Sequence, residues 1–435
     1  MKLRKNLVLG RLFVVLAGLM VLAGCGGGSN TTTTTTTTTT PVANTVSVAV
    51  NSGPANNAVN FAYVSVQVCN PGSATNCVTI PDVQVDTGSS GLRILASAPG
   101  VSGLSLKPVT GSNAAPVYEC IPFAADYLWG QVEQADVSMA GEKAASLPLQ
   151  VISSSATPSN LPSSCSAGSG SNLASSTALQ ANGILGIGNT LQDCGIACTG
   201  ASVLPYYWLC PCSGCILAQV PTATQVSNPV GFFNNDDNGV ILAMGPLAAV
   251  GAASATGTLT FGIGTQSDNA FSSSAKAYAI SLNSQIYFSI YLTYNNVTYP
   301  ALIDSSEFYN FFLDSTTVAA ASAGTGITSC LQNNTFYCTS SAVSLPFTAT
   351  DGSGDSAPAS IKIGDGTTLW NSSAENGGSN AAFSNLAGGM PLGASDYVVL
   401  GMPFFYGRAV YVGIAGKVPP TGVPSADADA GYWGF

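Results

Sequence analysis

The sequence predicts an all-β protein whose chain contains two similar halves. From Thr45 onward, short stretches of alternating apolar residues are divided by Gly, Pro, Ser and Asn, which is typical of strands joined by turns. No window of 15 residues shows the apolar period of a helix. A pattern of strand, turn, strand and aspartate occurs twice, which indicates that the fold is duplicated.

The composition restricts the function. Charged residues make up 7% of the 435 residues and apolar residues 46%, a balance that suits a secreted β-rich protein. The formal net charge is −10, and −14 without residues 1–24, so nucleic acid is not an expected partner. The chain contains no histidine, which excludes Ser-His-Asp catalysis, Cys-His catalysis and every His-ligated metal site. Paired carboxylates are one of the few hydrolytic devices that remain.

Residues 1–24 have the features of a signal peptide. Basic residues at the start precede an apolar stretch that is short for a membrane span. The stretch ends in Leu22-Ala23-Gly24-Cys25, which resembles the lipobox of bacterial lipoproteins. This resemblance implies cleavage before Cys25 and acylation of that cysteine, and the following Gly26 points to the outer membrane of the cell envelope. The alternative is a secreted protein in which this cysteine occurs by chance.

Residues 25–44 are predicted to be a lipid anchor and a tether. They include ten consecutive threonines and too few apolar side chains to bury a core. Two predicted lobes follow, residues 45–250 and residues 251–435. The tether is expected to hold them away from the membrane.

The first half contains a predicted hairpin that leads into an aspartate. Residues 58–68 and 78–86 read as strands, and the cysteines between them, Cys69 and Cys77, are expected to form a disulfide in an oxidising compartment. The second strand ends at Asp86 in a Gly/Ser turn, and apolar residues resume at once. Further on, Asn182–Gly188 is a short apolar segment that ends in glycine.

Eleven cysteines besides Cys25 leave at least one unpaired. Cys330–Cys338 is a second expected local disulfide, and Cys212 is the predicted unpaired residue. Zinc binding by the cysteine-rich stretch 194–215 is conceivable, but disulfides are favoured in an oxidising compartment. Its five cysteines are Cys194, Cys198, Cys210, Cys212 and Cys215.

The second half repeats this design. Two predicted strands joined at Asn295-Asn296 lead into Asp304, and Val398–Phe405 repeats the apolar segment with a glycine. Asp86 and Gly186 are 100 residues apart, and Asp304 and Gly401 are 97 residues apart. Two pairs at nearly equal spacing are far more specific than one Asp-Thr-Gly motif.

The turns at Asp86 and Asp304 resemble the catalytic loops of pepsin-like aspartic peptidases. Asn182–Gly188 and Val398–Phe405 resemble the threading segments that pass beneath those loops, and the resemblance covers roughly residues 46 to 415. The form Val-Asp-Thr-Gly-Ser-Ser-Gly-Leu-Arg also resembles bacterial lipoproteins of unassigned function. The resemblance implies a bilobal fold of two β-barrel-like lobes with a cleft between them, and a catalytic dyad. Asp86 and Asp304 would share a proton around a water. Thr87 and Ser305 would brace the two loops, and Gly88 would allow close backbone approach.

The resemblance also places a flap within residues 118–142. Phe123 lies nearest to the position of the flap tyrosine, and Tyr127 is the second candidate; packing in an ordinary hairpin is the alternative for both. The second loop departs from the family pattern, because Ser306 stands where glycine is expected and Glu307 follows. The serine can either be tolerated or rotate Asp304 out of the dyad.

Two functions are therefore predicted. The first is a membrane-tethered aspartic-type endopeptidase that hydrolyses peptide bonds with Asp86 and Asp304. The alternative is a catalytically degenerate pepsin-like scaffold that binds a peptide, glycan or protein in its interlobe cleft. Neither requires a cofactor, and no metal ligands are assigned. A two-sheet adhesin in which Asp-Thr-Gly is an ordinary turn is a remote third possibility.

Overall fold

The structure is a computed structural model of the chain. It describes residues 43–123, 126–153, 161–165, 170–200, 204–280, 290–313, 326–331, 335–352, 354–389 and 397–435. The chain divides into two units, Met1–Thr40 and Pro41–Phe435, and all described residues belong to the second. The predicted signal peptide and Cys25 lie outside the described residues.

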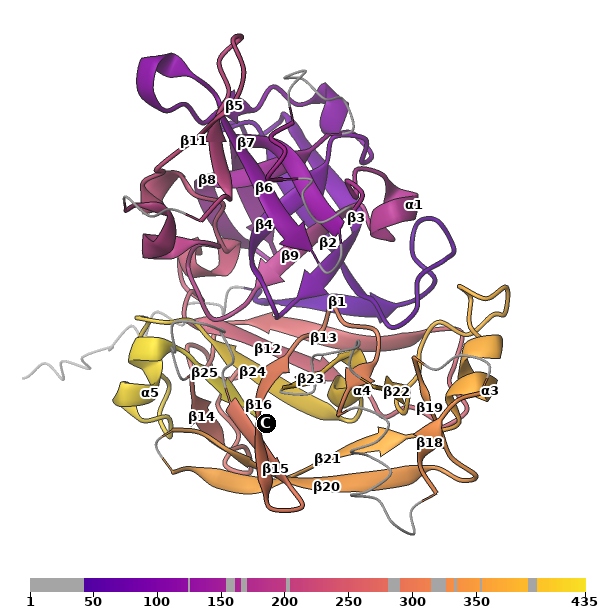
Figure 1. Cartoon of the computed structure of the whole chain (residues 1–435). Coiled ribbons are helices and arrows are strands. Elements are labelled where there is room, and N and C mark those ends of the chain that lie inside the picture. Colours follow the sequence, from indigo (N-terminus) through magenta and orange to yellow (C-terminus); the bar gives the residue numbers. More distant parts are fainter. Residues whose placement is uncertain are drawn as a thin grey trace, which may run out of the picture. The chain divides into compact units, whose positions relative to one another are not determined.

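Strands dominate the described residues, as predicted, and most of them form one large sheet (Figure 1). Its strands in chain order are β1 (Thr45–Val50), β2 (Ala62–Cys69), β3 (Cys77–Asp86), β4 (Ser90–Leu95), β5 (Lys107–Pro108), β6 (Val117–Phe123), β7 (Asp126–Met139), β8 (Glu142–Ile152), β9 (Gly183–Ile187), β10 (Tyr207–Leu209), β11 (Ile216–Leu217), β12 (Gly239–Met244), β13 (Ala255–Phe261), β14 (Ala277–Ala279), β24 (Arg408–Gly413) and β25 (Tyr432–Gly434).

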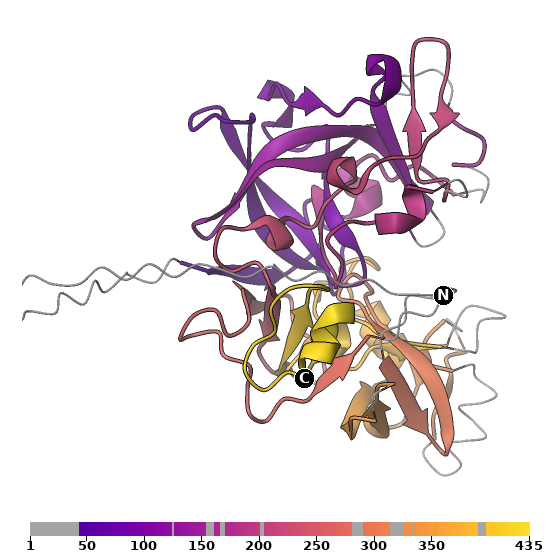
Figure 2. The same cartoon turned by 90° about the vertical axis from the view of Figure 1, so that its left-hand side faces the viewer.

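A second sheet is built from the other strands of the C-terminal half, and a two-stranded sheet accompanies it. The second sheet contains β15 (Ile290–Tyr294), β16 (Val297–Ile303), β17 (Asn310–Phe311), β20 (Val343–Thr350), β21 (Ser356–Ile363), β22 (Ala387–Gly388) and β23 (Val398–Leu400). The small sheet pairs β18 (Thr328–Ser329) with β19 (Tyr337–Cys338). In Figures 1 and 2 the first half is indigo to magenta, and the second half is orange to yellow.

The described helices are short, as the missing helical period predicts. The α-helices are α1 (Ser176–Leu179), α3 (Gly366–Asn371), α4 (Met402–Phe405) and α5 (Ser425–Ala430). The 3-10 turns are η1 (Val101–Gly103), η2 (Ser112–Ala114), η3 (Gly195–Cys198), η4 (Thr222–Thr224) and η5 (Pro229–Phe232). No helix among the described residues is long and apolar enough to cross a membrane.

The duplicated design is confirmed in the strand pairing. In the first half, β9 runs parallel to β3 and antiparallel to β4, and Gly186 lies opposite Asp86. In the second half, β23 runs parallel to β16 and antiparallel to β17. Ile303 lies opposite Leu400, so the next pair in register is Asp304 and Gly401. Each aspartate therefore sits beside the glycine of a threading segment.

The two halves share one part of the large sheet. There the strand order is β1-β13-β12-β24-β25-β14, so the first strand of the unit and its last strand belong to the same sheet. One cluster of buried apolar side chains includes residues of both halves, such as Val83 and Ile303. The predicted all-β fold with two similar halves is confirmed.

The predicted hairpins and disulfides are also present. β2 pairs with β3, and β15 pairs with β16 through Asn295 and Asn296, both of which have positive φ as a tight hairpin turn requires. The bridges Cys69–Cys77 and Cys330–Cys338 form as predicted. The other bridges are Cys120–Cys165, Cys194–Cys198 and Cys210–Cys215, and Cys212 is free and exposed. Disulfides, not zinc, therefore account for the cysteine-rich stretch.

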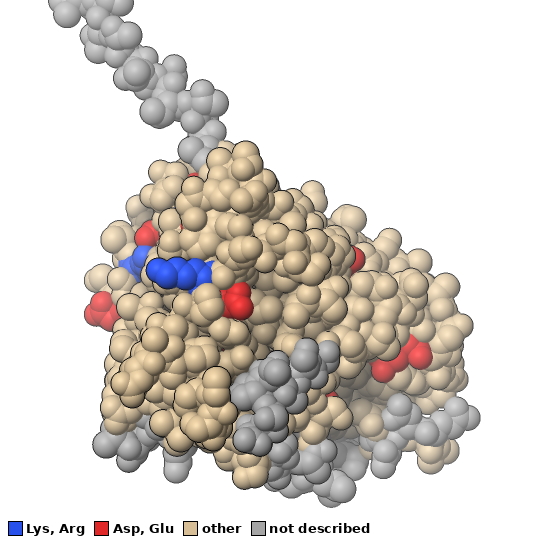
Figure 3. All heavy atoms as spheres, turned by 90° about the horizontal axis from the view of Figure 1, so that it is seen from above, with Lys and Arg blue, Asp and Glu red and all other residues tan. Residues whose placement is uncertain are grey.

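The surface carries few charges. Figure 3 shows one face on which a few acidic and basic side chains lie among many uncharged residues. This distribution agrees with the low fraction of charged residues in the sequence.

Candidate functional site

Two aspartate loops meet at the centre of the candidate site. We call Asp86–Ser89 the first aspartate loop and Asp304–Glu307 the second. Their backbones are joined by an exchange of hydrogen bonds: Thr87 Oγ1 donates to Ile303 O (2.9 Å) and accepts from Ser305 N (3.0 Å). Reciprocally, Ser305 Oγ donates to Val85 O (2.7 Å) and accepts from Thr87 N (3.1 Å). Both side chains are fully buried, and each hydroxyl forms its hydrogen bonds with the opposite half of the chain.

Gly88 brings the two carboxylates to one place. Its backbone N–H donates to Asp86 Oδ1 at 2.8 Å. A Cβ at this position would lie 2.8 Å from Asp304 Oδ1 and closer still to Oδ2. Only glycine therefore permits Asp304 to pack against the first aspartate loop.

Hydrogen-bond donors hold each carboxylate in place. Asp86 Oδ1 also accepts from Ser89 N (3.0 Å), and Asp86 Oδ2 accepts from the Ser89 hydroxyl. Asp304 Oδ1 accepts from both the backbone N (2.8 Å) and the hydroxyl (2.7 Å) of Ser306. Ser306 is not among the residues with positive φ, so its Cβ causes no backbone strain. The serine is thus tolerated, and its hydroxyl orients Asp304.

The electrostatics of the site involve three carboxyl groups. Burial raises the pKa of Asp304 well above its ordinary value, and the nearby carboxylates of Asp86 and Glu307 raise it further. Burial, followed by the charge of Asp86, raises the pKa of Glu307 to about 7. Glu307 is therefore electrostatically part of this cluster. The raised pKa values of Asp304 and Glu307 favour a proton that is shared within the cluster.

A cavity of about 360 Å³ adjoins the first aspartate loop. Its wall includes Thr87–Ser90 of the first half, and Leu302 and Trp433 of the second half. Ile121, on the β6–β7 hairpin, also lines it. The lining is mostly apolar, and neither candidate aspartate belongs to it. Such a cavity suits an apolar side chain of a ligand that also reaches the aspartate loops.

The two flap candidates lie at the end of the β6–β7 hairpin. Phe123 pairs with Asp126, and Tyr127 pairs with Pro122, while residues 124–125 lie outside the described residues. Phe123 packs against the main core, and Tyr127 packs on the cluster around Cys120 and Cys165. Among the described residues, no contact links the side chain of Phe123 or Tyr127 to Asp86 or Asp304. Ile121 reaches the cavity instead, which sequence reasoning missed because only aromatic residues were considered.

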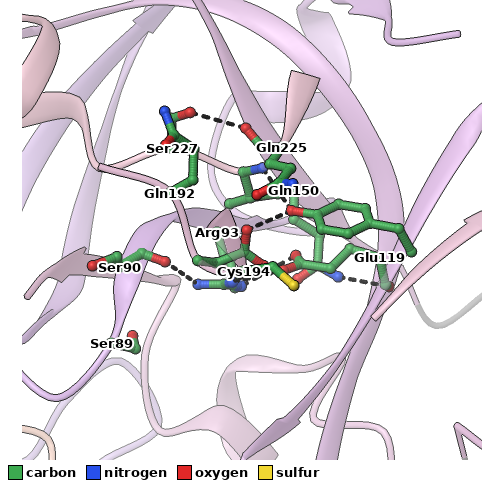
Figure 4. A network of polar contacts seen from close by, with 12 residues as sticks. Ser89, Ser90, Arg93, Glu119, Gln150, Gln192, Cys194, Gln225 and Ser227 are labelled. Atoms are coloured by element: carbon green, nitrogen blue, oxygen red, sulfur yellow. Dashed lines mark hydrogen bonds and ion pairs between the residues drawn. The ribbon is translucent and has the colours of Figure 1, made fainter. Parts of the chain in front are cut away.

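A buried charge network lies beside the cavity (Figure 4). Arg93 is 2% exposed and donates from Nε (3.2 Å) and Nη2 (2.6 Å) to Glu119, and more weakly from Nη2 to Asp193 (3.4 Å). Its Nη1 donates to Ser90 O at 3.1 Å, which ties the guanidinium to the end of the Asp86 turn. Tyr207 donates to Asp193 Oδ1 at 2.6 Å.

This network contains one cation and two carboxyl groups. Burial raises the pKa of Asp193 well above its ordinary value, and the carboxylate of Glu119, to which it is hydrogen-bonded, raises it further. The raised pKa favours the protonated form of Asp193, in which the charge of Arg93 is balanced by one carboxylate. Sequence reasoning missed this network; the only signal was a basic residue next to the Asp86 motif in a chain with few charges.

Comparisons with known proteins give a family and a likeness to solved structures. A family model described as "Protein of unknown function (DUF3443)" matches residues 40–433. A search of curated proteins finds no match. The chain is similar to the crystal structure of an aspartic proteinase from Irpex lacteus, with 14% identity and a TM-score of 0.46. That likeness covers 89% of this chain and 96% of the proteinase.

Proposed function

Because the chain belongs to the DUF3443 family, whose function is unknown, we propose an activity from its own site: an aspartic-type endopeptidase that uses Asp86 and Asp304. The observation that carries the proposal is the contact of Gly88 with both carboxylates. Gly88 N binds Asp86, and the absence of a Cβ leaves room for Asp304. The exchange between Thr87 and Ser305 supports it, because it fixes the two loops in one register.

The geometry supports a division of roles within the dyad. Asp304 would hold the shared proton, because burial and neighbouring carboxylates raise its pKa. It would donate that proton to the carbonyl oxygen of a peptide bond. Asp86, held by donors from Gly88 and Ser89, would accept a proton from the attacking water. The apolar cavity beside Thr87–Ser90 would receive a side chain of the extended peptide.

A binding scaffold is the second candidate, and Glu307 is the observation that favours it. A third acidic group near Asp86 and Asp304 adds negative charge to the site, which disturbs proton sharing by the dyad. In that case the protein would bind a peptide, glycan or protein without cleaving it. Asp86 would remain as the acceptor that shapes its own turn.

Cleavage of an unfolded protein tests the two candidates. We expect the unit Pro41–Phe435 to cleave it between about pH 3 and pH 7, and Asp86→Asn and Asp304→Asn to lower the rate by about 10³-fold or more. Asparagine keeps the shape of each side chain and its hydrogen-bond acceptor. Activity that persists in Asp304→Asn overturns the dyad. Binding of the unfolded protein without cleavage, unchanged in both variants, favours the scaffold.

Glu307→Gln is expected to change how stability depends on pH. The pKa of Glu307 in the folded state, about 7, exceeds the ordinary 4.5, so the folded protein keeps a proton that the unfolded chain has lost. Stability contributed by this group therefore falls as pH rises from about 4.5 to 7. The variant should match the natural protein near pH 4 and exceed it in stability near pH 8.

Urea unfolding at the two pH values measures this difference. Asp429→Asn is the matched control, because Asp429 is an exposed acid and lies in a different element. An equal effect of Glu307→Gln at both pH values contradicts the raised pKa.

We further propose that the protein is anchored through an acylated Cys25, which lies outside the described residues. The proposal rests on the lipobox-like Leu22-Ala23-Gly24-Cys25 and the basic and apolar segments before it. An anchored position in the cell envelope would place the site near proteins that cross or line the envelope.

A further inference from the structure

Three carboxylates outside the two aspartate loops lie close together. They belong to Asp351, Asp355 and Asp427, and one oxygen from each lies within 4.8 Å of the others. Asp351 and Asp355 come from the turn between β20 and β21, and Asp427 comes from α5. The sequence separates these elements by more than 70 residues, so the fold creates the cluster.

Backbone donors hold Asp351 at the centre of this cluster. Its Oδ1 accepts from the backbone N of Gly354 and of Asp355, both at 3.0 Å, and its Oδ2 accepts from Ala279 N at 2.8 Å. Asp351 therefore fixes the turn against β14. Asp355 is partly exposed and forms an ion pair with Lys276.

Asp427 provides an independent sign of a ligand. Its side chain is 3% exposed, and its Oδ2 accepts no hydrogen bond from any described residue. A buried carboxylate oxygen without a partner costs free energy unless a cation compensates it. The pKa of Asp427 is raised by burial and by the charges of Asp351 and Asp355, which shows that these groups repel one another.

The hydroxyl of Tyr278, on β14, is a second buried polar group at this place. Its side chain is completely buried, and the hydroxyl has no hydrogen-bond partner among the described residues. The charges of Asp351 and Asp355 act on it, so it lies close to the cluster. An ion with its own water molecules would satisfy both Tyr278 and Asp427.

We propose that Asp351, Asp355 and Asp427 bind a calcium ion. Calcium takes oxygen ligands at about 2.3–2.6 Å, so two ligands of one ion can be up to about 5 Å apart, as these oxygens are. The donors are all oxygens, which disfavours zinc. Three acidic side chains, two from one turn and one from α5, suit the flexible coordination of the larger ion better than the tight octahedron of magnesium.

Bound calcium would connect α5 to the turn between β20 and β21 and to β14. In Figure 1, α5 (yellow) lies beside β14, and the two elements are in contact. Ala430 at the end of α5 and Trp433 on β25 line the cavity beside the first aspartate loop. Calcium would therefore stabilise one wall of that cavity, although the ion and the dyad are separate sites.

Terbium luminescence tests the site on the metal-free unit Pro41–Phe435. Tb³⁺ replaces Ca²⁺, and Tyr278 is close enough to the cluster to sensitise its emission. We expect Tb³⁺ emission that Ca²⁺ quenches by competition and that a similar concentration of Mg²⁺ does not. Calcium should also raise the melting temperature.

Variants distinguish binding at this site from a general attraction of cations to acidic residues. Asp427→Asn should lower the affinity for Ca²⁺ at least tenfold. Asp429→Asn is the matched control, because it removes the same charge from an exposed position of the same helix and should not change the affinity. Lys276→Met should increase the affinity several-fold, because it removes the cation that pairs with Asp355.

The Lys276 variant also covers the case in which Asp427→Asn fails to fold. Absence of calcium-sensitive emission in both the natural unit and Lys276→Met overturns the proposal. Equal loss of affinity in Asp427→Asn and Asp429→Asn overturns it as well, because it shows diffuse attraction of cations.

Discussion

Arg93→Met is expected to lower the free energy of unfolding by about 3–5 kcal/mol. The guanidinium is 2% exposed and is the cation that faces the buried carboxyls of Glu119 and Asp193. Methionine fills part of the same volume but leaves those groups without a positive partner. The loss should be greater at pH 8 than at pH 5, because at lower pH the carboxyls take up protons.

Two further variants show whether the loss of stability comes from unpaired buried charge. Lys107→Met removes a cation from an exposed position of β5 and should change stability by less than about 0.5 kcal/mol. The triple variant Arg93→Met, Glu119→Gln, Asp193→Asn should recover much of the loss, because no buried charge remains. If the single and triple variants are equally unstable in urea, lost packing rather than unpaired charge explains the effect.

Gly88→Ala is expected to lower the proposed peptidase activity by about 10²-fold or more. The added Cβ would overlap the carboxylate of Asp304, so either the side chain rotates or the two aspartate loops separate. Either change would move Asp86 or Asp304 out of the position that catalysis requires. Rates of cleavage of an unfolded protein, measured at equal concentrations of folded enzyme, test this expectation.

Gly103→Ala is the control for this substitution. Gly103 lies in η1, and a Cβ there would meet no atom within 4 Å, so activity should stay the same. Full activity in Gly88→Ala would show that Asp304 has no fixed position that the reaction needs.

Local patterns explain why much of the fold could be predicted. Alternating apolar residues marked β2 and β3, the Asn295-Asn296 turn marked the β15–β16 hairpin, and cysteines eight residues apart marked two disulfides. Each of these signals is local, or repeats at a regular spacing. The two threading segments were predictable because the duplication supplied an internal check.

The parts that were not predicted depend on contacts between distant residues. Glu119 and Asp193 lie 26 and 100 residues from Arg93, and neither belongs to a recognisable motif. Whether Ser306 orients or displaces Asp304 depends on the direction of the Ser306 side chain. The spacing of residues along the sequence does not show that direction. Likewise, Asp427 lies 76 residues beyond Asp351, and only the folded chain brings them together.

The shared part of the large sheet also determines the order in which this chain can fold. Thr45–Val48 of β1 pair with β13 alone, and Thr45 meets Thr260. β12 pairs with β24, in which Gly239 meets Gly413. Pairing between strands that are about 200 residues apart in the sequence forms slowly. Until it forms, the unpaired edge can pair with other chains. Among the described strands, β1 is synthesised first but paired late, so protection of its open edge until β13 is available would raise the yield of native protein.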